Sequence, residues 1–301
     1  MTLTCVGSIA FDAVETPSGR RARLLGGSAV HFSIASSRFA PTRIVGPVGD
    51  DFGQEEYEIL HRCGVLTDDV EHVPGGKTFF WAGRYHRDIN HRDTLQTDLN
   101  VFENFRPKLS DASRGAEALF LGNIQPDLQR EVREQCGGAR FVAMDSMNLW
   151  IDIAHDSLLA TVATVDCLVL NDAELKQMTD EPVLIRAARR AIEMGPRVVI
   201  AKQGEYGSTM FTRDSFFSLS AYPTPDIIEP TGAGDTFAGG LMGYLASLDG
   251  EIDDAAIRRA MAYGTACASF NVEGFGSERL YDLDRAEIDA RVAELERASR
   301  L

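Results

Sequence analysis

The chain is short of paired cysteines, long apolar runs and positive charge, and each shortage excludes a class of protein. Its five cysteines lie far apart with no C-x-x-C pair, so neither a zinc site nor a disulfide framework is indicated. No charged leader followed by a long apolar segment opens the sequence, and no apolar run is long enough to span a membrane. Lys and Arg number 30 against 45 Asp and Glu, a net charge of −15, which would repel a phosphate backbone. We therefore expect a cytoplasmic protein with no membrane or nucleic-acid partner, in which an anionic substrate needs a local positive site.

The 301 residues and the 44% hydrophobic content suit a large α/β domain with a sizeable core. From residue 118 to residue 204, short apolar runs alternate with helix-like segments, as in ALFLGNI, RFVAMDSM, CLVLND and RVVIAKQG. Such runs predict parallel strands buried on both faces, and hence a doubly wound α/β core. Residues 2–10 are predicted as one further buried strand that ends at Asp12, where open sheets place ligand contacts. An Asx-turn is the alternative role of Asp12.

Residues 70–105 have a different texture. They are rich in aromatic and β-branched residues, contain turn signals and show no helical period. This predicts a small set of strands appended to the main sheet. The segment would act as a lid that keeps water from a reacting group, or as an edge hairpin that makes an oligomer contact, and the two roles are compatible.

Residues 226–248 hold the most informative stretch, D-I-I-E-P-T-G-A-G-D-T-F-A-G-G-L-M-G-Y-L-A-S-L. The apolar residues after Asp235 lie on one face of a helix, which predicts that a helix starts near Asp235. The run Thr231-Gly232-Ala233-Gly234 before it has almost no side-chain bulk, so the free N–H groups of the helix start can bind an anion. A carboxylate beside a phosphate would repel it unless it accepts a proton from the attacking group. The sequence thus indicates phosphoryl transfer with Asp235 as base, or simply a capped helix after a Gly-rich turn.

Other polar residues follow predicted strands and would gather at one edge of the sheet, namely Asp12, Asn123, Asp145, Asn171 and Lys202. Asn171 and Glu174 are three residues apart, which suits a magnesium ion held through water, or a capping box. Lys202-x-Gly204-x-x-Gly207 would bring backbone N–H groups near a nucleotide, or form a plain turn. Gly26-Gly27 before a helix lets a ligand approach the backbone, or makes a tight turn.

Together these pieces resemble the PfkB family of sugar and nucleoside kinases over nearly the whole chain. The motifs that carry the resemblance are Gly26-Gly27, V-G-D-D-F-G at 48–53, N-D-A-E at 171–174, K-Q-G-E-Y-G at 202–207 and, most specific, P-T-G-A-G-D-T-F at 230–237. The resemblance implies the ribokinase-like fold, a three-layer α/β/α doubly wound and mainly parallel sheet with a small β-strand lid. It implies one domain over residues 1–301, a lid at 70–105 with a further lid strand from 12–25, and a homodimer formed through the lid.

The resemblance also implies roles for individual residues. Asp235 takes the proton of the acceptor hydroxyl, and the anion hole is formed by Gly232, Ala233 and Gly234. Magnesium and phosphate are organised by Asn171 and Glu174, with the metal held by Glu174 through water. Residues expected beside ATP are Lys202, Gly204, Gly207, Thr231 and Gly276. Residues expected at the acceptor are Asp12, Gly26, Gly27, His31 and Asn123.

Two departures from the family pattern, at Glu229 and His31, and one further residue, Arg84, bear on the cation and the substrate. Glu229 stands where many relatives have an Asp that helps to hold a monovalent cation, which puts potassium activation in doubt. His31 stands where many sugar kinases have an Asn that grips the sugar, so we expect a changed acceptor; His31 would donate to a substrate hydroxyl or be bonded internally. Arg84 would meet a phosphate already on the acceptor, or face solvent.

The sequence therefore predicts a kinase dependent on ATP and Mg²⁺ that phosphorylates an alcohol of a sugar or a related small molecule by direct in-line transfer. A nucleoside acceptor is the alternative within the family, since a base would stack on aromatic residues drawn from Phe11, Phe79, Phe80, Trp81 and Tyr85. A non-catalytic ligand-binding protein that retains the fold is the alternative outside it. An intact base, anion hole and N-x-x-E pair argue against that second alternative.

Overall fold

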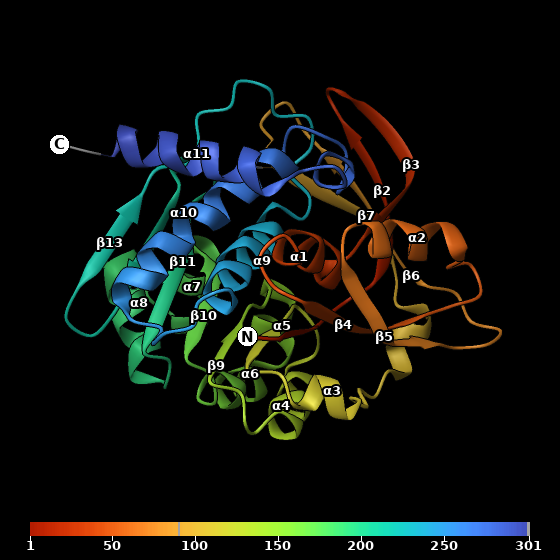
Figure 1. The fold of residues 1–301 in the computed structure, drawn as a ribbon, viewed down its shortest axis with the longest axis horizontal. Helices are drawn as coiled ribbons and strands as arrows, with labels where there is room; N and C mark the ends of the chain where they lie inside the picture. Colours follow the sequence, from red (N-terminus) through yellow and green to blue (C-terminus); the bar gives the residue numbers. More distant parts are fainter. Residues whose placement is uncertain (90, 300–301) are drawn as a thin grey trace.

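The computed structural model describes residues 1–89 and 91–299, and its main sheet has nine strands in the order β13-β12-β11-β10-β9-β8-β1-β4-β5 (Figure 1). Seven strands of this sheet run parallel, namely β11, β10, β9, β8, β1, β4 and β5. Strands β12 and β13 form an antiparallel hairpin at one edge. The bounds are β1 Leu3–Val6, β4 Thr42–Val48, β5 Val65–His72, β8 Ala118–Leu121, β9 Phe141–Met144, β10 Cys167–Asn171, β11 Val198–Lys202, β12 Ser208–Phe211 and β13 Phe216–Leu219. The predicted doubly wound α/β core is confirmed.

Helices cover both faces of this sheet because its central strands are apolar on both sides. In β10, Cys167 and Val169 belong to one hydrophobic cluster, and Leu168 and Leu170 belong to the other. The first cluster is closed by α1 Ser28–Ser36, α2 Gln54–Arg62, α9 Ala233–Ala246, α10 Asp254–Asn271 and α11 Arg285–Ala298. The second is closed by α4 Pro126–Gln135, α5 Asn148–Ile153, α6 His155–Val162, α7 Asp172–Thr179 and α8 Leu184–Glu193, with the short α3 Asp111–Arg114 beside α4. The result is a three-layer α/β/α arrangement.

A second sheet of four strands lies at the end of the molecule away from β13 (Figure 1). Its order is β3-β2-β6-β7, with bounds β3 Gly19–Gly26, β2 Ala10–Thr16, β6 Phe79–Tyr85 and β7 Arg92–Asp98. Residues 10–16, 19–26, 79–85 and 92–98 thus build it, whereas residues 70–72 complete β5 of the main sheet. We refer to these four strands as the lid sheet.

The prediction of one strand over residues 2–10 is wrong. Strand β1 ends at Val6, and β2 starts at Ala10 in the lid sheet, so Asp12 lies inside a lid strand instead of after a strand of the main sheet. The first turn of α1 separates the two strands: the Ala29 N–H donates to the Ser8 carbonyl at 3.0 Å, and a Cβ on Gly7 would lie 2.6 Å from Ser28 Oγ. A continuous apolar run conceals this turn because the turn is itself buried.

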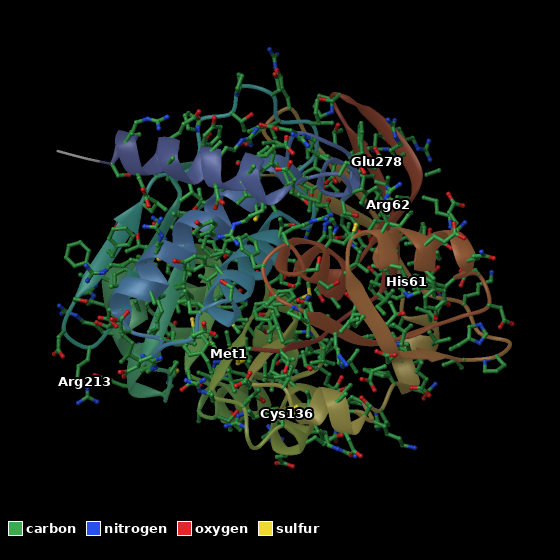
Figure 2. All side chains as sticks on the ribbon, in the orientation of Figure 1. Met1, His61, Arg62, Cys136, Arg213 and Glu278 are labelled. Atoms are coloured by element: carbon green, nitrogen blue, oxygen red, sulfur yellow. The ribbon has the colours of Figure 1, made fainter. Side chains whose placement is uncertain are left out.

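All five cysteines are buried free thiols; one of them, Cys136, is marked in Figure 2 at the end of α4. Figure 2 also shows Arg213 pointing outward from the turn of the β12–β13 hairpin. Within the residues that the structure describes, no helix combines the length and the apolar character needed to cross a bilayer.

Candidate active site

The start of α9 carries the three residues predicted to form the anion hole, Gly232, Ala233 and Gly234. Gly232 is its N-cap with φ +74°, and a Cβ there would lie 2.3 Å from the His31 ring, so only glycine fits. The Ala233 N–H donates to the Pro230 carbonyl at 3.1 Å. The amides of Gly232 and Gly234 have no such partner in the described chain, and they lie at the positive end of a 14-residue helix. Of the three predicted anion-hole residues, the two glycines therefore have amides free for a phosphoryl group.

Asn271, which the sequence analysis did not single out, holds this loop in place. Its side chain is fully buried, and its Nδ2 donates to the Thr231 carbonyl at 2.8 Å. Its Oδ1 lies 3.1 Å from Thr236 Oγ1 and 3.2 Å from His31 Nδ1. Because that oxygen only accepts, His31 Nδ1 carries a proton, and the imidazole supports the loop from beneath Gly232.

His31 is thus bonded internally at one nitrogen, with 1% of its surface exposed. Its Nε2 is buried and has no hydrogen-bond partner within the described residues. The ring packs under the anion hole, so the sequence expectation that His31 grips the acceptor directly stays a prediction.

Glu229 joins the anion-hole loop to the loop at Gly276. Its side chain is fully buried, with Oε1 accepting from the Thr231 N–H at 2.5 Å and Oε2 accepting from the Gly276 N–H at 3.1 Å. Gly276, with φ +54°, packs on Leu24 of the lid sheet. Gly276 therefore contributes to the site through Glu229, and does not line the cavity described below.

Asp235 lies in the first turn of α9 beside a second carboxyl group, that of Asp145 after β9. Burial raises the pKa of Asp235, and the positive charges of His31 and Lys202 oppose this rise. Burial also raises the pKa of Asp145 well above its usual range, and the neighbouring Asp235, with which it shares a side-chain hydrogen bond, adds to the rise. A carboxylate with a raised pKa is a stronger base, so this environment suits Asp235 for removing a proton from a hydroxyl.

A cavity of about 390 Å³ leads to the anion hole. Its lining includes Lys202, Gly204, Gly207, Ala233 and Gly234, together with apolar residues such as Ala221, Pro223, Ile227, Phe237 and Ala268. A Cβ on Gly234 would lie 2.7 Å from Lys202 Nζ, which places the ammonium group at the anion hole. A cavity whose lining combines apolar side chains with backbone amides and an ammonium group fits a base and its attached phosphates.

The backbone conformation favours glycine at positions 204 and 207, whether or not a ligand binds there. Gly204 opens a 3₁₀ turn, Gly204–Tyr206, with φ +57°. Gly207 has φ +97°, and a Cβ there would lie 2.0 Å from the Leu219 carbonyl of β13. Both glycines line the cavity, so the predicted turn and the predicted nucleotide contact are compatible.

Asn171 and Glu174 form the capping box that the sequence left open as an alternative. The Glu174 N–H donates to Asn171 Oδ1 at 2.7 Å, and the Asn171 N–H donates to Glu174 Oε2 at 2.9 Å. Burial raises the pKa of Glu174, and Lys202 and the Asn171 N–H oppose that rise. No cluster of three acidic, His or Cys side chains in the described residues has metal-binding geometry. The carboxylate oxygens of Glu174 and Asp145 nevertheless fit Mg²⁺, a hard cation that takes few protein ligands and completes its shell with water and phosphate oxygens.

Asp12, which is predicted to bind the acceptor, is held in place by the predicted glycine pair Gly26-Gly27. Its carboxylate is 5% exposed and accepts from the Gly27 N–H. A Cβ on Gly26 would lie 2.0 Å from Asp12 Oδ2, and Gly27 has φ +92°, so the glycine pair is required for this contact. Burial, followed by the charge of Glu229, raises the pKa of Asp12 to about 7.

Asn123, the other polar residue predicted at the acceptor, has partners within the protein for both side-chain atoms. Its Oδ1 accepts from Trp150 Nε1 at 3.0 Å, and its Nδ2 contacts Met147 Sδ at 3.1 Å.

The lid sheet touches the anion-hole loop directly. Tyr85 Oη lies 2.9 Å from Thr231 Oγ1, and Tyr85 belongs to a small apolar cluster with Val14, Leu24 and Phe275. Of the other aromatic residues considered for stacking, Phe11 is buried, whereas Phe79, Phe80 and Trp81 are half-buried. Arg84 pairs with Glu15 at 3.1 Å, and both side chains are exposed, so it does not meet the site.

This arrangement, an anion hole and a raised-pKa carboxylate at the edge of a doubly wound sheet under a lid, is that of a kinase with the ribokinase-like fold. A family model described as the pfkB family carbohydrate kinase matches residues 2–282, and the chain belongs to this family. It is 26% identical over 309 residues to a nucleoside kinase of Methanothermobacter thermautotrophicus, covering 92% of this chain and 91% of that protein. It is 31% identical over 267 residues to a deoxyribokinase of Salmonella typhi, covering 85% and 84%. The structure of the Burkholderia thailandensis nucleoside kinase with inosine shares the fold, with a TM-score of 0.78, 23% identity and coverage of 98% and 97%.

Proposed function

We propose that this kinase transfers the γ-phosphoryl group of ATP to an alcohol of a sugar or a related small molecule, with Asp235 as the base. The observation that supports this most is the pairing at the start of α9: a carboxylate whose pKa is raised by burial stands beside free amides at a helix N-terminus. Free amides bind an anion, and the transferring phosphoryl group is one. The carboxylate accepts a proton, and the attacking hydroxyl supplies it.

In the proposed reaction the acceptor hydroxyl gives its proton to Asp235 as its oxygen bonds to the γ-phosphorus. The bond from that phosphorus to the bridging oxygen breaks, and ADP leaves with the electron pair. The amides of Gly232 and Gly234 and the ammonium group of Lys202 stabilise the charge on the transferring group. Mg²⁺, held by Glu174 and Asp145 with water, would supply positive charge to the phosphates.

Asp12 is proposed to bind the acceptor, since a carboxylate accepts hydrogen bonds from neighbouring sugar hydroxyls. A nucleoside is the second candidate. It is favoured by the half-buried Trp81 and the apolar lid cluster near Asp12, which offer an apolar surface to a base. Relatives named as nucleoside kinase, cytidine kinase and deoxyribokinase support both candidates, because each of those names specifies a ribose-type sugar, free or within a nucleoside.

We further propose that the enzyme works without a monovalent cation. The buried carboxylate of Glu229 is already satisfied by two backbone N–H groups. Pairing of two copies through the lid stays a prediction, supported by the edge strands β3 and β7, each of which has a neighbour on one side only.

A substrate panel tests the proposal. The protein is incubated with ATP, Mg²⁺ and a set of pentoses, hexoses and nucleosides, and ADP release is followed together with the mass of the phosphorylated product. We expect equal amounts of ADP and of one phosphorylated acceptor. ATP binding by calorimetry with no product from any member of the panel would support the non-catalytic alternative instead.

A further inference from the structure

The charges around the transfer site do not balance with the residues assigned so far. Its carboxyl groups are those of Asp12, Asp145, Glu174, Glu229 and Asp235, and the cationic side chains described so far beside them are Lys202 and His31. A nucleoside triphosphate adds further negative charge, which becomes concentrated on the transferring group. A further cation at the site would lower the cost of bringing these charges together.

The lid sheet supplies one. Arg92 is the first residue of β7 and pairs in register with Tyr85 of β6. Its guanidinium carbon lies 5.0 Å from the centroid of the Trp81 ring, and its side chain hydrogen-bonds to that of Tyr85. Since Tyr85 Oη contacts Thr231 Oγ1 at 2.9 Å, Arg92 is one side chain away from the anion-hole loop.

Arg92 is also within electrostatic reach of the proposed acceptor contact. Burial raises the pKa of Asp12, and the positive charge of Arg92 is among the smaller effects that oppose this rise.

Among the described residues, no acidic side chain forms an ion pair with this guanidinium group. Arg84, on the neighbouring lid strand, is paired with Glu15 at 3.1 Å. None of the ion pairs found among the described residues involves Arg92, whose side chain is exposed and rests on Trp81. It is therefore free to bind an anion, and its planar fork suits two phosphoryl oxygens at once.

We propose that Arg92 is a catalytic residue whose guanidinium group donates hydrogen bonds to the oxygens of the γ-phosphoryl group during transfer. This inference rests on the proposed function. In the step itself, the acceptor O–H bond breaks to Asp235, the new oxygen–phosphorus bond forms and the bond to ADP breaks; Arg92 donates hydrogen bonds throughout and keeps its protons. Because it comes from the lid, its charge arrives only when the lid lies over the site.

The test compares R92Q and R92K with R84Q, a matched control that removes an arginine from the same sheet. R92Q should lower kcat by roughly 10³-fold, the low end of the range for an arginine that neutralises a transferring phosphoryl group. R92K should recover part of the loss, since it restores the charge without the fork. The KM for ATP should change by less than about twofold in R92Q and in R92K, because the residues that line the cavity bind ATP before transfer and Arg92 does not. R84Q should match the wild type.

A second readout does not depend on turnover. Binding of ADP, Mg²⁺ and aluminium fluoride, which imitates the transferring group, should weaken strongly in R92Q, whereas binding of ADP alone should not change. A kcat in R92Q within about threefold of the wild type overturns the role of Arg92. So does a rise in the acceptor KM alone, which would make Arg92 an acceptor contact. D235N separates the two ideas: a slow D235N with a normal R92Q leaves the kinase assignment standing and removes only this inference.

Discussion

The replacement of Asp12 by Asn tests whether the buried carboxylate of the wild type lowers the stability of the fold while it contributes to acceptor binding. The pKa of this carboxyl group rises from 3.8 to about 7 on folding, chiefly through burial. The folded state therefore binds a proton more tightly than the unfolded state between these two values. The wild-type protein loses stability as the pH rises through that window, and the loss is complete above pH 7. An amide at this position has no charge to lose.

The size of the effect follows from the shift. About three pKa units correspond to a ceiling of about 4 kcal/mol for the ionised group. We expect about half of that ceiling, because the introduced amide N–H₂ group needs partners of its own. The amide oxygen can still accept from the Gly27 N–H, so D12N should fold. The stability advantage of D12N should grow between about pH 5 and about pH 8 by roughly 1–2 kcal/mol.

Urea unfolding of D12N and wild type at the two pH values measures this directly. D282N is the matched control, since the Asp282 side chain is 87% exposed and the same chemical change there removes no buried charge. D12N should also raise the KM for the acceptor by roughly tenfold or more while the KM for ATP is kept. A D12N protein that is less stable than wild type at about pH 8, or a difference that does not vary with pH, would refute the reasoning.

Three further results are expected. G232A should lower the melting temperature clearly, since Gly232 has φ +74° and a Cβ there meets the His31 ring at 2.3 Å; a normal thermal melt would contradict this. G234A should keep the fold, because its Cβ meets only the mobile end of Lys202, but should raise the KM for ATP by roughly tenfold as the ammonium group is displaced; an unchanged KM would remove Lys202 from the anion hole. Exchange of potassium for sodium should leave the rate unchanged, since Glu229 is already satisfied; strong activation by potassium would show otherwise.

Much of the main sheet could be predicted because its strands are short and buried on both faces. The runs at Ala118–Leu121, Cys167–Asn171 and Val198–Lys202 are flanked by helices with clear apolar faces. The N-terminal segment was predicted wrongly because its apolar run continues through a buried turn at Gly7. An apolar pattern predicts that a strand is buried, but it does not predict to which of two sheets the strand belongs.

Of the site, the sequence could supply the elements that adjoin in the chain. The helix start at Asp235 and the capping box of Asn171 and Glu174 depend on neighbouring residues, and local patterns describe them well. The contacts of Asn271 and the pairing of Asp145 with Asp235 join residues far apart in sequence. Asp145 was recognisable only as a polar residue after a strand, and no local signal could show which carboxylate it would face.

The most direct test of the central claim is the turnover of D235N with ATP and the acceptor identified from the panel, measured beside its affinity for ATP. The account predicts a kcat lower by roughly 10²–10⁴-fold, the usual contribution of a positioned base, with ATP binding largely kept. A D235N protein that turns over at the wild-type rate would contradict it.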